Sequence, residues 1–593
     1  MNDNSFKGDS AALPQAELLS AQVATPEFSP AEVSAAVVVD ELLRLGMKDA
    51  VVCPGSRSAP LARALFLASQ EHKVRLHVRI DERAAAFLAL GLAAATGVVT
   101  PIVTTSGTAV ANLLPAMVEA HASSLPLLAL TADRPAHYRG TGANQTIVQH
   151  RLFADASVAE FDLDGTQEVT AAVAGHIRAR VDRIVAAMAQ GPAHLNIRFV
   201  EPLVPQQERP VVIPEGREQS RPWTRIAAGR GRGAGQAAGE PLSIDISRRT
   251  LVIAGSGAVH IPALEELPTI AEPNAYAPAV PVHPLAAATF EQIPPEQILV
   301  VGRPTLHRGV ARLLARNDIE VTIVSEAALD GAGVRYPDVS ATAQAVVHPG
   351  ALRVKGQQEE QWLSVCDAAS QLAVTAVRES IAESSSQLTG LHVAAAVADS
   401  IRTGEQLVLG ASNSVRDASW VGLPFPGVDC YAGRGAAGID GTIATAIGLA
   451  LARDRAHADE FRPPRTIALM GDLTFQHDAG ALAIGPGEPR PENLTIVVAN
   501  DSGGGIFETL EAGAPALRAS FERIFATAQD VDVQALSQAY GVDYVFVDNL
   551  TDLLAQLHPD TDVDGIRVIE VATDRHSRRS LHAKLTYNAQ LDL

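Results

Sequence analysis

Cysteine is scarce in this chain, which argues against two common ways of cross-linking a fold, disulfide bonds and zinc sites. The 593 residues include three cysteines, Cys53, Cys366 and Cys430. They lie far apart in the sequence and form no CxxC pair, so neither a disulfide framework nor a zinc site is indicated. This usage is typical of a reducing compartment, and we expect a cytoplasmic protein.

Basic residues are also in short supply. Lysine and arginine together number 47 against 67 aspartates and glutamates, which gives a formal net charge of −20. A chain this negative is a poor partner for nucleic acid or for an anionic membrane. An anionic substrate would therefore need a local group of arginines that acts against the overall field.

The sequence has no segment suited to crossing a membrane. No charged residue occurs from Ala84 to Val118, but Gly91, Gly97 and Pro101 interrupt this stretch. It predicts a helix, a strand, a turn and a second helix rather than a single apolar helix of about 20 residues. The N-terminus lacks a basic region followed by an apolar one, so we predict no signal peptide.

Length and composition indicate a large globular protein of several domains. Hydrophobic residues make up 47% and charged residues 19% of the chain. Because one domain typically holds about 100–200 residues, we expect three. The first helix is predicted to start at Ser29, a helix cap followed by Pro30 and by the capping-box acid Glu32.

Apolar strands alternate with helices along the chain, which predicts an α/β fold of three doubly wound parallel-sheet domains. The predicted strands are 49–53, 76–80, 101–105, 125–131 and 193–200 in the first unit, 250–254, 297–301 and 320–324 in the second, and 466–470 and 494–499 in the third. The predicted division is a flexible N-terminal lead over 1–28, a first domain over 29–205, a linker over 206–243, a central α/β domain over 244–356, a helical bridge over 357–390 and a third domain over 391–593.

The central unit contains a glycine turn, Gly255-Ser-Gly257, directly after a predicted strand. Such a turn could open a dinucleotide site, but His260 stands where the third glycine of that fingerprint belongs. A plain strand-to-helix turn is the favoured interpretation.

Two strands of the third unit lead into acidic residues, Asp472 and Asp501, one strand–helix–strand crossover apart. The carboxyl ends of parallel strands meet at one edge of a sheet, so the two acids can converge there. Hard oxygen ligands suit Mg²⁺, which borrows further ligands from a phosphate. From spacing alone, a role in capping turns is an equal alternative.

A glycine-rich loop, Tyr431-Ala-Gly-Arg-Gly-Ala-Ala-Gly-Ile-Asp-Gly441, precedes a predicted helix over 442–452. Loops of this kind bring backbone N–H groups and a helix N-terminus to an anion such as a diphosphate. Close helix packing is the alternative, and it accounts for Gly448 better than for the loop.

Together, Gly471-Asp472 and Asn500-Asp501-Ser502-Gly503 resemble the bipartite metal and diphosphate motif of thiamine-diphosphate enzymes, usually Gly-Asp-Gly followed by Asn-Asn. The resemblance implies thiamine diphosphate and Mg²⁺, for which Mn²⁺ can substitute, with the metal held by Asp472, Asp501 and the carbonyl of Gly503. Leu473 and Asp501 depart from the usual motif, but an aspartate remains a good oxygen ligand.

Glu82 follows a predicted strand and starts a helix. Taken alone, it would be a first-turn acid that complements the helix dipole. The resemblance instead implies the glutamate that hydrogen-bonds the cofactor's aminopyrimidine and promotes its reactive tautomer. That chemistry needs a carboxylate shielded from water.

Further segments indicate one branch of the family, the 2-succinyl-5-enolpyruvyl-6-hydroxy-3-cyclohexene-1-carboxylate synthases of menaquinone biosynthesis. The segments that carry this resemblance are Pro54-Gly-Ser-Arg-Ser-Ala-Pro60, Thr131-Ala-Asp-Arg-Pro135, Gly142-Ala-Asn-Gln145, Gly410-Ala-Ser-Asn-Ser-Val-Arg-Asp417, Gly433-Arg-Gly435 and Gly471-Asp-Leu-Thr474. It implies decarboxylation of 2-oxoglutarate and 1,4-addition of the resulting four-carbon carbanion to isochorismate.

The same resemblance implies roles for individual residues. The side that receives 2-oxoglutarate involves Ser412, Arg416 and Arg434, and the isochorismate side involves Ser56, Arg57, Arg134, Asn144 and Gln145. Of these, Arg57, Gln145 and Arg416 join Glu82 as the expected catalytic residues. The cofactor is expected to contact Glu82, Gly410, Gly433, Arg434, Gly435, Gly438, Ile439, Asp472, Leu473, Ile506 and Phe507.

Both substrates are dicarboxylates, which suit the bidentate hydrogen bonds of arginine. His307 and Arg308 are weaker candidates for the same site, because the family tends to have lysine where His307 stands. Relatives bind one cofactor between two subunits, so we expect a homodimer or homotetramer. The alternatives are an acetolactate-synthase-like carboligase that uses pyruvate and a non-catalytic thiamine-diphosphate-binding protein.

Overall fold

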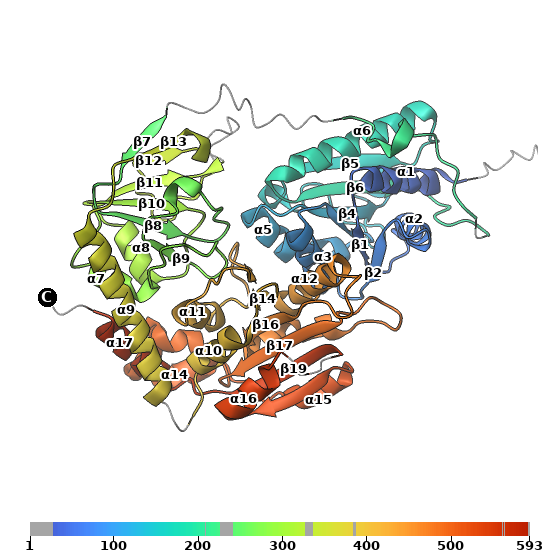
Figure 1. Ribbon diagram of the computed structural model, residues 1–593. Helices are drawn as coiled ribbons and strands as arrows, with labels where there is room; N and C mark the ends of the chain where they lie inside the picture. The colour runs from blue at the N-terminus through green and yellow to red at the C-terminus, as the bar shows by residue number, and fades with distance from the viewer. Residues whose placement is uncertain are drawn as a thin grey trace, which may run out of the picture.

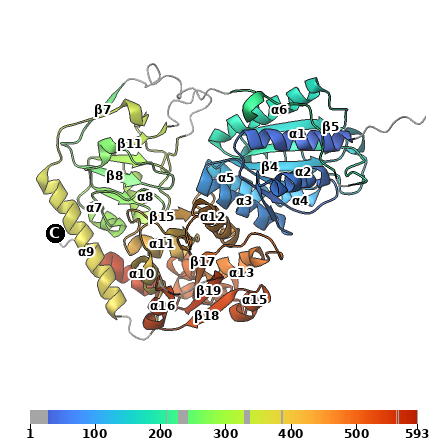
Figure 2. The ribbon, with the colours of Figure 1, turned by 45° about the vertical axis from the view of Figure 1, so that its right-hand side comes forward.

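Three α/β units are grouped side by side in the computed structural model, which describes residues 28–207, 209–225, 241–326, 336–383, 387–559, 561 and 564–590. In Figure 1 the first unit is blue to cyan, the central unit green and the third unit orange to red. Figure 2 shows the same grouping after a turn of 45°. Residues 1–27 of the expected lead over 1–28 and the glycine-rich part of the linker, 230–236, lie outside the described residues.

The first unit is a parallel sheet of six described strands in the order β2-β1-β3-β4-β6-β5. Helix α1 starts as expected, because Ser29 and Glu32 form a capping box in which each side chain accepts the other residue's backbone N–H. The strands are β1 (Asp49–Val52), β2 (Arg75–Val78), β3 (Thr100–Thr104), β4 (Leu127–Asp133), β5 (Ala159–Gly165) and β6 (Ala193–Phe199); the helices are α1 (Pro30–Arg44), α2 (Ala59–Gln70), α3 (Glu82–Thr96), α4 (Thr108–Ala111), α5 (Leu114–Ala122) and α6 (Ala171–Ala187).

The central unit has a parallel sheet in the order β12-β11-β10-β8-β9 and a separate pair, β13-β7. Its strands are β7 (Leu242–Asp245), β8 (Thr250–Ala254), β9 (Thr269–Ala271), β10 (Gln297–Val301), β11 (Glu320–Val324), β12 (Ala345–Val347) and β13 (Leu352–Lys355), with helices α7 (Ala287–Phe290) and α8 (Arg308–Leu314). Helix α9 (Glu360–Glu383) runs from this unit toward the third, as Figures 1 and 2 both show.

The third unit is a parallel sheet in the order β15-β14-β16-β17-β19-β18. Its strands are β14 (Gln406–Leu409), β15 (Asp429–Ala432), β16 (Thr466–Gly471), β17 (Asn493–Asn500), β18 (Asp543–Val547) and β19 (Gly565–Ala572). Its helices are α10 (Gly390–Ser400), α11 (Asn413–Trp420), α12 (Thr442–Ala456), α13 (Asp472–Asp478), α14 (Arg518–Phe521), α15 (Val533–Ala539), α16 (Leu550–Leu557) and α17 (Arg578–Asn588).

The first and third units share one topology. When the strands of each unit are numbered in chain order, both sheets have the order 2-1-3-4-6-5. Helices α3 and α12 follow the second strand of their respective units, so they occupy equivalent positions. The chain therefore contains the same sheet arrangement twice.

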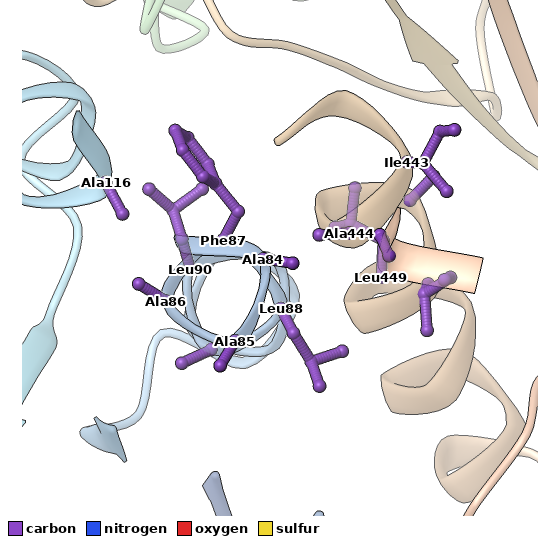
Figure 3. Packing of buried hydrophobic residues seen from close by; sticks show 14 of the residues in the cluster. Ala84, Ala85, Ala86, Phe87, Leu88, Leu90, Ala116, Ile443, Ala444 and Leu449 are labelled. Atoms are coloured by element: carbon purple, nitrogen blue, oxygen red, sulfur yellow. The ribbon is translucent and has the colours of Figure 1, made fainter. Parts of the chain in front are cut away.

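These two equivalent helices pack against each other and join the units. Figure 3 shows Ala84 and Leu88 on the side of α3 that faces α12. The crossing is close enough that a Cβ on Gly91 would lie 2.3 Å from the carbonyl oxygen of Thr445, and one on Gly448 would lie 2.4 Å from that of Leu88. Glycine at these positions thus permits backbone-to-backbone packing, as expected for Gly448.

The predicted fold class, α/β, is confirmed. Each of the three units contains a parallel sheet, of six, five and six described strands in chain order. The charge-free stretch forms helix, strand and helices, and no described helix is long and apolar enough to span a membrane. The bridge over 357–390 contains α9 as expected. The predicted domain boundaries stay a prediction.

Candidate active site

A cavity of about 270 Å³ opens at the carboxyl ends of the strands in the third unit. The strand order reverses between β14 and β16, which is where open α/β sheets bind ligands. Both strand ends contribute to the wall, with Ala411–Ser414 after β14 and Gly471–Thr474 after β16. The segments 411–414 and 471–474, which lie about sixty residues apart in the sequence, therefore meet at one point.

Asp472 and Asp501 both line this cavity, as predicted. Burial raises the pKa of Asp472 to about 6. Burial, together with the negative charge of Asp472, raises the pKa of Asp501 to about 7. The buried Asp472 and the half-buried Asp501 repel each other and form a site for a cation, so the donor set fits Mg²⁺.

The loop after β17 is shaped by its glycines. Gly503 has φ +137° and a Cβ there would lie 2.4 Å from the carbonyl oxygen of Ala526. A Cβ on Gly505 would lie 1.9 Å from Oδ2 of Asp501. Glycine at 505 therefore leaves room for the Asp501 carboxylate. Gly503 also lines the cavity, and its role at the metal stays a prediction.

Ser412 has an unusual backbone conformation at the start of α11. Its φ of 86° is rare for a residue with a side chain, and such strain concentrates at functional sites. Its carbonyl oxygen accepts a hydrogen bond from the guanidinium of Arg416 one turn later. Next to it, Oδ1 of Asn413 is buried and has no hydrogen-bond partner in the described structure. A polar ligand in the cavity would satisfy this oxygen.

Positive charge gathers beside this wall. Burial and the nearby charge of Arg434 lower the pKa of Arg416 to about 10. Burial also lowers the pKa of Arg434, which the carboxylates of Glu272 and Glu119 partly offset. Two guanidinium groups this close suit a ligand with negative charge.

His307 belongs to the same cluster but is neutral. Burial and the charge of Arg416 lower its pKa to about 3. Its Nε2 lies 2.8 Å from Oγ of Ser419. Arg308 is exposed, and its nearest acid is Glu511 at 3.8 Å. His307 therefore offers a polar contact here, not a cation.

Four of the remaining predicted cofactor residues of the third unit line this cavity, and the others lie outside its wall. The wall includes Ile439, Leu473, Ile506 and Phe507. Gly410 packs against Met470 of β16, where a Cβ would lie 3.0 Å from the Met470 Cβ. The loop residues Gly433, Arg434, Gly435 and Gly438 precede Ile439.

Glu82 lies elsewhere in the chain. It is the first residue of α3, it is half-buried, and its Oε2 accepts a hydrogen bond from Nδ2 of Asn112 at 3.4 Å. Among the described residues that line the Asp472 cavity, none comes from the first unit. A single chain therefore does not bring Glu82 to the acids, and the shielding that its chemistry needs is incomplete.

Ser56 and Arg57 lie at the equivalent switch point of the first unit, between β1 and β3. Here the chain is tightly packed, since a Cβ on Gly55 would lie 2.3 Å from that of Thr105. Ser56 is exposed, whereas Arg57 is buried and donates to the carbonyl of Phe199 at 3.1 Å. Arg57 also pairs with the exposed carboxylate of Glu201 at 2.9 Å.

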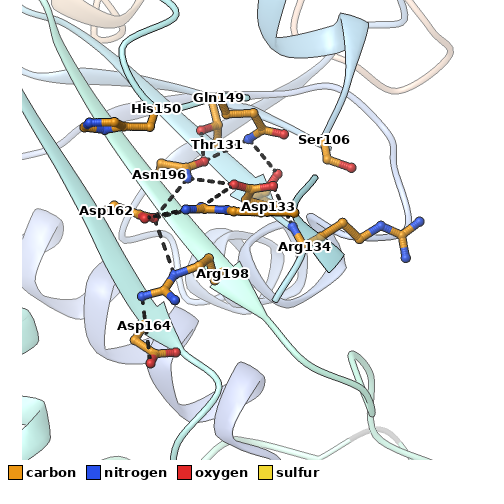
Figure 4. Close-up of polar contacts among 12 residues, drawn as sticks. Ser106, Thr131, Asp133, Arg134, Gln149, His150, Asp162, Asp164, Asn196 and Arg198 are labelled. Atoms are coloured by element: carbon orange, nitrogen blue, oxygen red, sulfur yellow. Dashed lines mark hydrogen bonds and ion pairs between the residues drawn. The ribbon is translucent and has the colours of Figure 1, made fainter. Parts of the chain in front are cut away.

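A buried polar cluster at the end of β4 anchors the segment that carries Arg134 (Figure 4). Asp133 is fully buried and accepts hydrogen bonds from Arg139 at 2.5 Å and Asn196 at 3.0 Å. It also accepts the backbone N–H of Arg134 at 2.7 Å. The Arg134 side chain points away from this cluster, so it remains available to a ligand.

The following turn carries Asn144 and Gln145, which are both exposed. Gln145 has a φ of 56° and is tied to Ser106 by two hydrogen bonds of 2.9 Å, one in each direction. Nearby, Gln149 is buried and accepts the N–H of Gly107 at 3.3 Å. The polar residues predicted for the isochorismate side are thus held at one end of the first sheet.

Sequence reasoning missed several contacts of the site. Arg578 donates to the buried Asp417 at 2.6 Å, and both line the cavity. Thr305 accepts from Arg434 at 2.9 Å, and Glu119 accepts two backbone N–H groups of the glycine-rich loop. These residues come from other elements or other units, and no local motif marks them.

A group that could be mistaken for a metal site lies outside the cavity. Glu508, Glu522 and His576 have ligand atoms within 4.8 Å of one another. Arg575 pairs with both carboxylates, at 2.8 Å and 2.6 Å, and Arg518 pairs with Glu508 at 2.7 Å. The guanidinium groups already neutralise these acids, so the group is an ion-pair network.

The glycine turn of the central unit has no nucleotide fingerprint around it. A Cβ on Gly255 would lie 2.1 Å from the nitrogen of Pro304, so glycine here serves close backbone packing. Ser256 forms an antiparallel bridge with Arg303. This agrees with the favoured interpretation, a plain turn.

Fold and site define a class: this is an enzyme of the thiamine-diphosphate-dependent type. Residues 33–152 match the family model of the thiamine pyrophosphate enzyme N-terminal TPP binding domain. The chain belongs to the 2-succinyl-5-enolpyruvyl-6-hydroxy-3-cyclohexene-1-carboxylate synthase family. It is 45% identical to the synthase of that name from Corynebacterium glutamicum over 567 residues, 93% of this chain and 98% of the relative. It is 47% identical to that from Mycobacterium sp. strain JLS over 574 residues, 94% and 99% of the two chains.

Proposed function

We propose that the chain catalyses the thiamine-diphosphate-dependent decarboxylation of 2-oxoglutarate and the 1,4-addition of the four-carbon product to isochorismate, in menaquinone biosynthesis. The observation that carries the proposal is the cavity at the switch point of the third sheet, with Asp472 and Asp501 on its wall and Arg416 and Arg434 close by. Family membership supports the same conclusion.

Asp472, Asp501 and the carbonyl of Gly503 would hold Mg²⁺ or Mn²⁺, and the metal would bind the cofactor's diphosphate. The two raised pKa values support this role, because a divalent cation relieves the repulsion between the acids. When bound, thiamine diphosphate supplies an electron sink for a 2-oxo acid that loses CO₂. Ile439, Ile506 and Phe507 would keep water from the reacting end of the cofactor.

Arg416 and Arg434 would bind the distal carboxylate of 2-oxoglutarate, with Ser412 as a further donor. This carboxylate survives decarboxylation, so a partner must hold it throughout the reaction. The effect of Arg434, whose charge helps burial to lower the pKa of Arg416, supports the role, because an anion between the guanidinium groups would offset this repulsion.

Isochorismate would contact the first unit through Ser56, Arg57, Arg134, Asn144 and Gln145. These residues lie at the carboxyl end of the first sheet and, except for Arg57, are at least partly exposed. In one chain they do not line the cavity with Asp472. The two halves of the site must therefore come together in another way.

A second copy of the chain would complete the site, in a homodimer or a homotetramer of dimers. The first unit of one subunit would bring Glu82 to the cofactor held by the third unit of its partner. The apolar side chain of Ile80, two residues before Glu82, is 78% exposed, which supports this arrangement. The enzyme would act in the cytoplasm.

The test is ultraviolet detection of isochorismate loss by the purified full chain with thiamine diphosphate, Mg²⁺ and 2-oxoglutarate. We expect the loss to require all three additions. Equal or faster reaction with pyruvate in place of 2-oxoglutarate would instead indicate the acetolactate-like carboligase. Cofactor binding without any turnover would indicate a non-catalytic protein.

A further inference from the structure

A buried carboxylate of the first unit contacts the glycine-rich loop of the third. Glu119 lies on α5, is 6% exposed, and has no place in the proposed reaction. Its Oε1 accepts the backbone N–H of Gly435 at 2.8 Å, and its Oε2 accepts that of Ala436 at 2.6 Å. Ser123 adds a third hydrogen bond to Oε1 at 2.8 Å. One side chain thus binds two successive peptide groups more than three hundred residues away.

The local sequence of the loop fits this contact. A Cβ on Gly435 would lie 2.6 Å from Oε1 of Glu119, and a Cβ on Gly433 would lie 3.8 Å from its Cδ. A side chain at 435 would therefore push the carboxylate away. Gly433, on the other side of Arg434 in the sequence, faces the same Glu119 carboxylate at ordinary van der Waals distance. The Gly-Arg-Gly segment is adapted to an acid beside it.

Arg434, between these glycines, is held by the other units as well. Its carbonyl accepts a hydrogen bond from Arg303 at 3.0 Å, and its guanidinium donates to Oγ1 of Thr305 at 2.9 Å. Arg303 and Thr305 belong to the central unit, whereas Glu119 belongs to the first. The position of Arg434 is therefore set by contacts from both other units.

The loop has little core packing of its own to set its position. One side faces a cavity of about 870 Å³ between the three units, which Gly433, Ala436 and Gly438 help to line. Ala437 and Ile439 line the smaller cavity with Asp472. A thin segment between two cavities depends on its polar contacts, and the charged hydrogen bonds to Glu119 are the strongest kind available.

We infer that Glu119 is a positioning residue of the active site: it fixes the loop 433–439 so that Arg434 meets the distal carboxylate of 2-oxoglutarate and Ile439 meets the cofactor. This inference rests on the proposed function. It also makes a claim about the free protein, because the loop should be held before any ligand binds.

The experiment compares full-length Glu119→Gln with two control variants. Glutamine keeps the shape but turns one acceptor into an N–H₂ donor that faces a backbone N–H. Ser123→Ala removes a hydrogen bond from the same carboxylate and leaves both loop contacts. Asp182→Asn alters another buried carboxylate that accepts a backbone N–H, that of Thr224, away from the loop.

In the free protein, amide hydrogen exchange over 433–439 should be at least about tenfold faster in Glu119→Gln than in wild type, and unchanged in both controls. In the holoenzyme, the KM for 2-oxoglutarate should rise about tenfold or more, while the KM for isochorismate stays within about twofold. Thiamine diphosphate affinity, measured by calorimetry with Mg²⁺, should fall as well.

Unchanged exchange in the loop would overturn the inference. So would an equal rise of both KM values with a lower melting temperature, since that pattern indicates a general loss of packing. If Glu119→Gln does not fold, Gly435→Ala disturbs the same contact from the loop. That variant must then give the same selective rise in the KM for 2-oxoglutarate. If the wild-type protein does not consume isochorismate, the proposed function fails. Amide hydrogen exchange over 433–439 in the free protein then decides the role of Glu119 by itself.

Discussion

At the scale of single residues, Glu82 carries the first prediction. Glu82→Gln removes the carboxylate but keeps the shape of the side chain, which accepts a long hydrogen bond of 3.4 Å from Asn112. We expect kcat to fall about a hundredfold or more, because acid–base assistance of this kind contributes about 10²–10⁴-fold. Calorimetry should show nearly unchanged cofactor affinity. A near-normal kcat would remove Glu82 from the mechanism.

The second prediction is that Arg416 determines the preference of the enzyme for 2-oxoglutarate over pyruvate. Losing a charge-assisted contact typically costs about 1.5–3 kcal/mol, so Arg416→Ala should lower kcat/KM for 2-oxoglutarate about ten- to a hundredfold. Any residual rate with pyruvate should change far less, because pyruvate lacks a distal carboxylate. The measurement is the ratio of kcat/KM for the two acids. An unchanged ratio would contradict the assignment.

The metal site should be sensitive to acid. Burial raises the pKa of Asp472 to about 6, and burial with the charge of Asp472 raises that of Asp501 to about 7. Protons therefore compete with the metal as the pH falls through this range. Apparent Mg²⁺ affinity should drop about tenfold to twentyfold from about pH 8 to about pH 6. Titration calorimetry at several pH values measures it, and a pH-independent affinity would place the metal elsewhere.

How much of the site could be predicted depended on where each residue lies. Asp472 and Asp501 follow apolar strands, so local sequence predicted that they would meet at one sheet edge. Glu119 and Thr305 touch the loop only because separate units pack together. Nothing in the residues around them signals that contact.

At the scale of elements, the crossing of α3 and α12 yields a stability prediction. Gly448→Ala would place a Cβ 2.4 Å from the Leu88 carbonyl oxygen. Helix propensity favours alanine by about 1 kcal/mol, but a backbone clash between two helices outweighs it. We expect a net loss of about 2 kcal/mol or more in the free energy of unfolding.

Denaturant unfolding measures this loss, with Gly485→Ala as the control. The nearest atom to a Cβ on Gly485 is Cγ of Glu488 at 3.5 Å, an ordinary contact. That variant should stay within about 0.5 kcal/mol of wild type. Similar effects in both variants would mean that the helix crossing is not tight.

The strands that were predicted lie within about two residues of the observed ones, because an unbroken apolar run leaves few alternatives. The prediction did not include β7, β9, β12, β13, β14, β15, β18 and β19, although β9 and β14 are buried. Strand β5 was missed as well. Strand β5 lies at the edge of the sheet, and most of its residues are half-buried. Along it the acids Glu160, Asp162 and Asp164 alternate with apolar residues. Charged edge residues prevent strand pairing between molecules, and they also hide the strand from a search for apolar runs.

At the scale of the whole molecule, the repeated sheet topology was not visible in the sequence. The two units have different apolar runs and loop lengths, so no sequence repeat marks them. The sequence did indicate that one cofactor must bridge the first and third units. In a single chain the cavity with Asp472 contains no described residue of the first unit, which agrees with a site shared between subunits.

The most direct test of the account is therefore a mixed dimer. Glu82→Gln and Asp472→Ala chains, co-expressed with two different affinity tags, can be purified together as heterodimers. If the site combines Glu82 of one subunit with Asp472 of the other, one of two sites is intact. The heterodimer should then show about half the wild-type rate of isochorismate loss with 2-oxoglutarate. A heterodimer no more active than either variant alone would contradict the shared site.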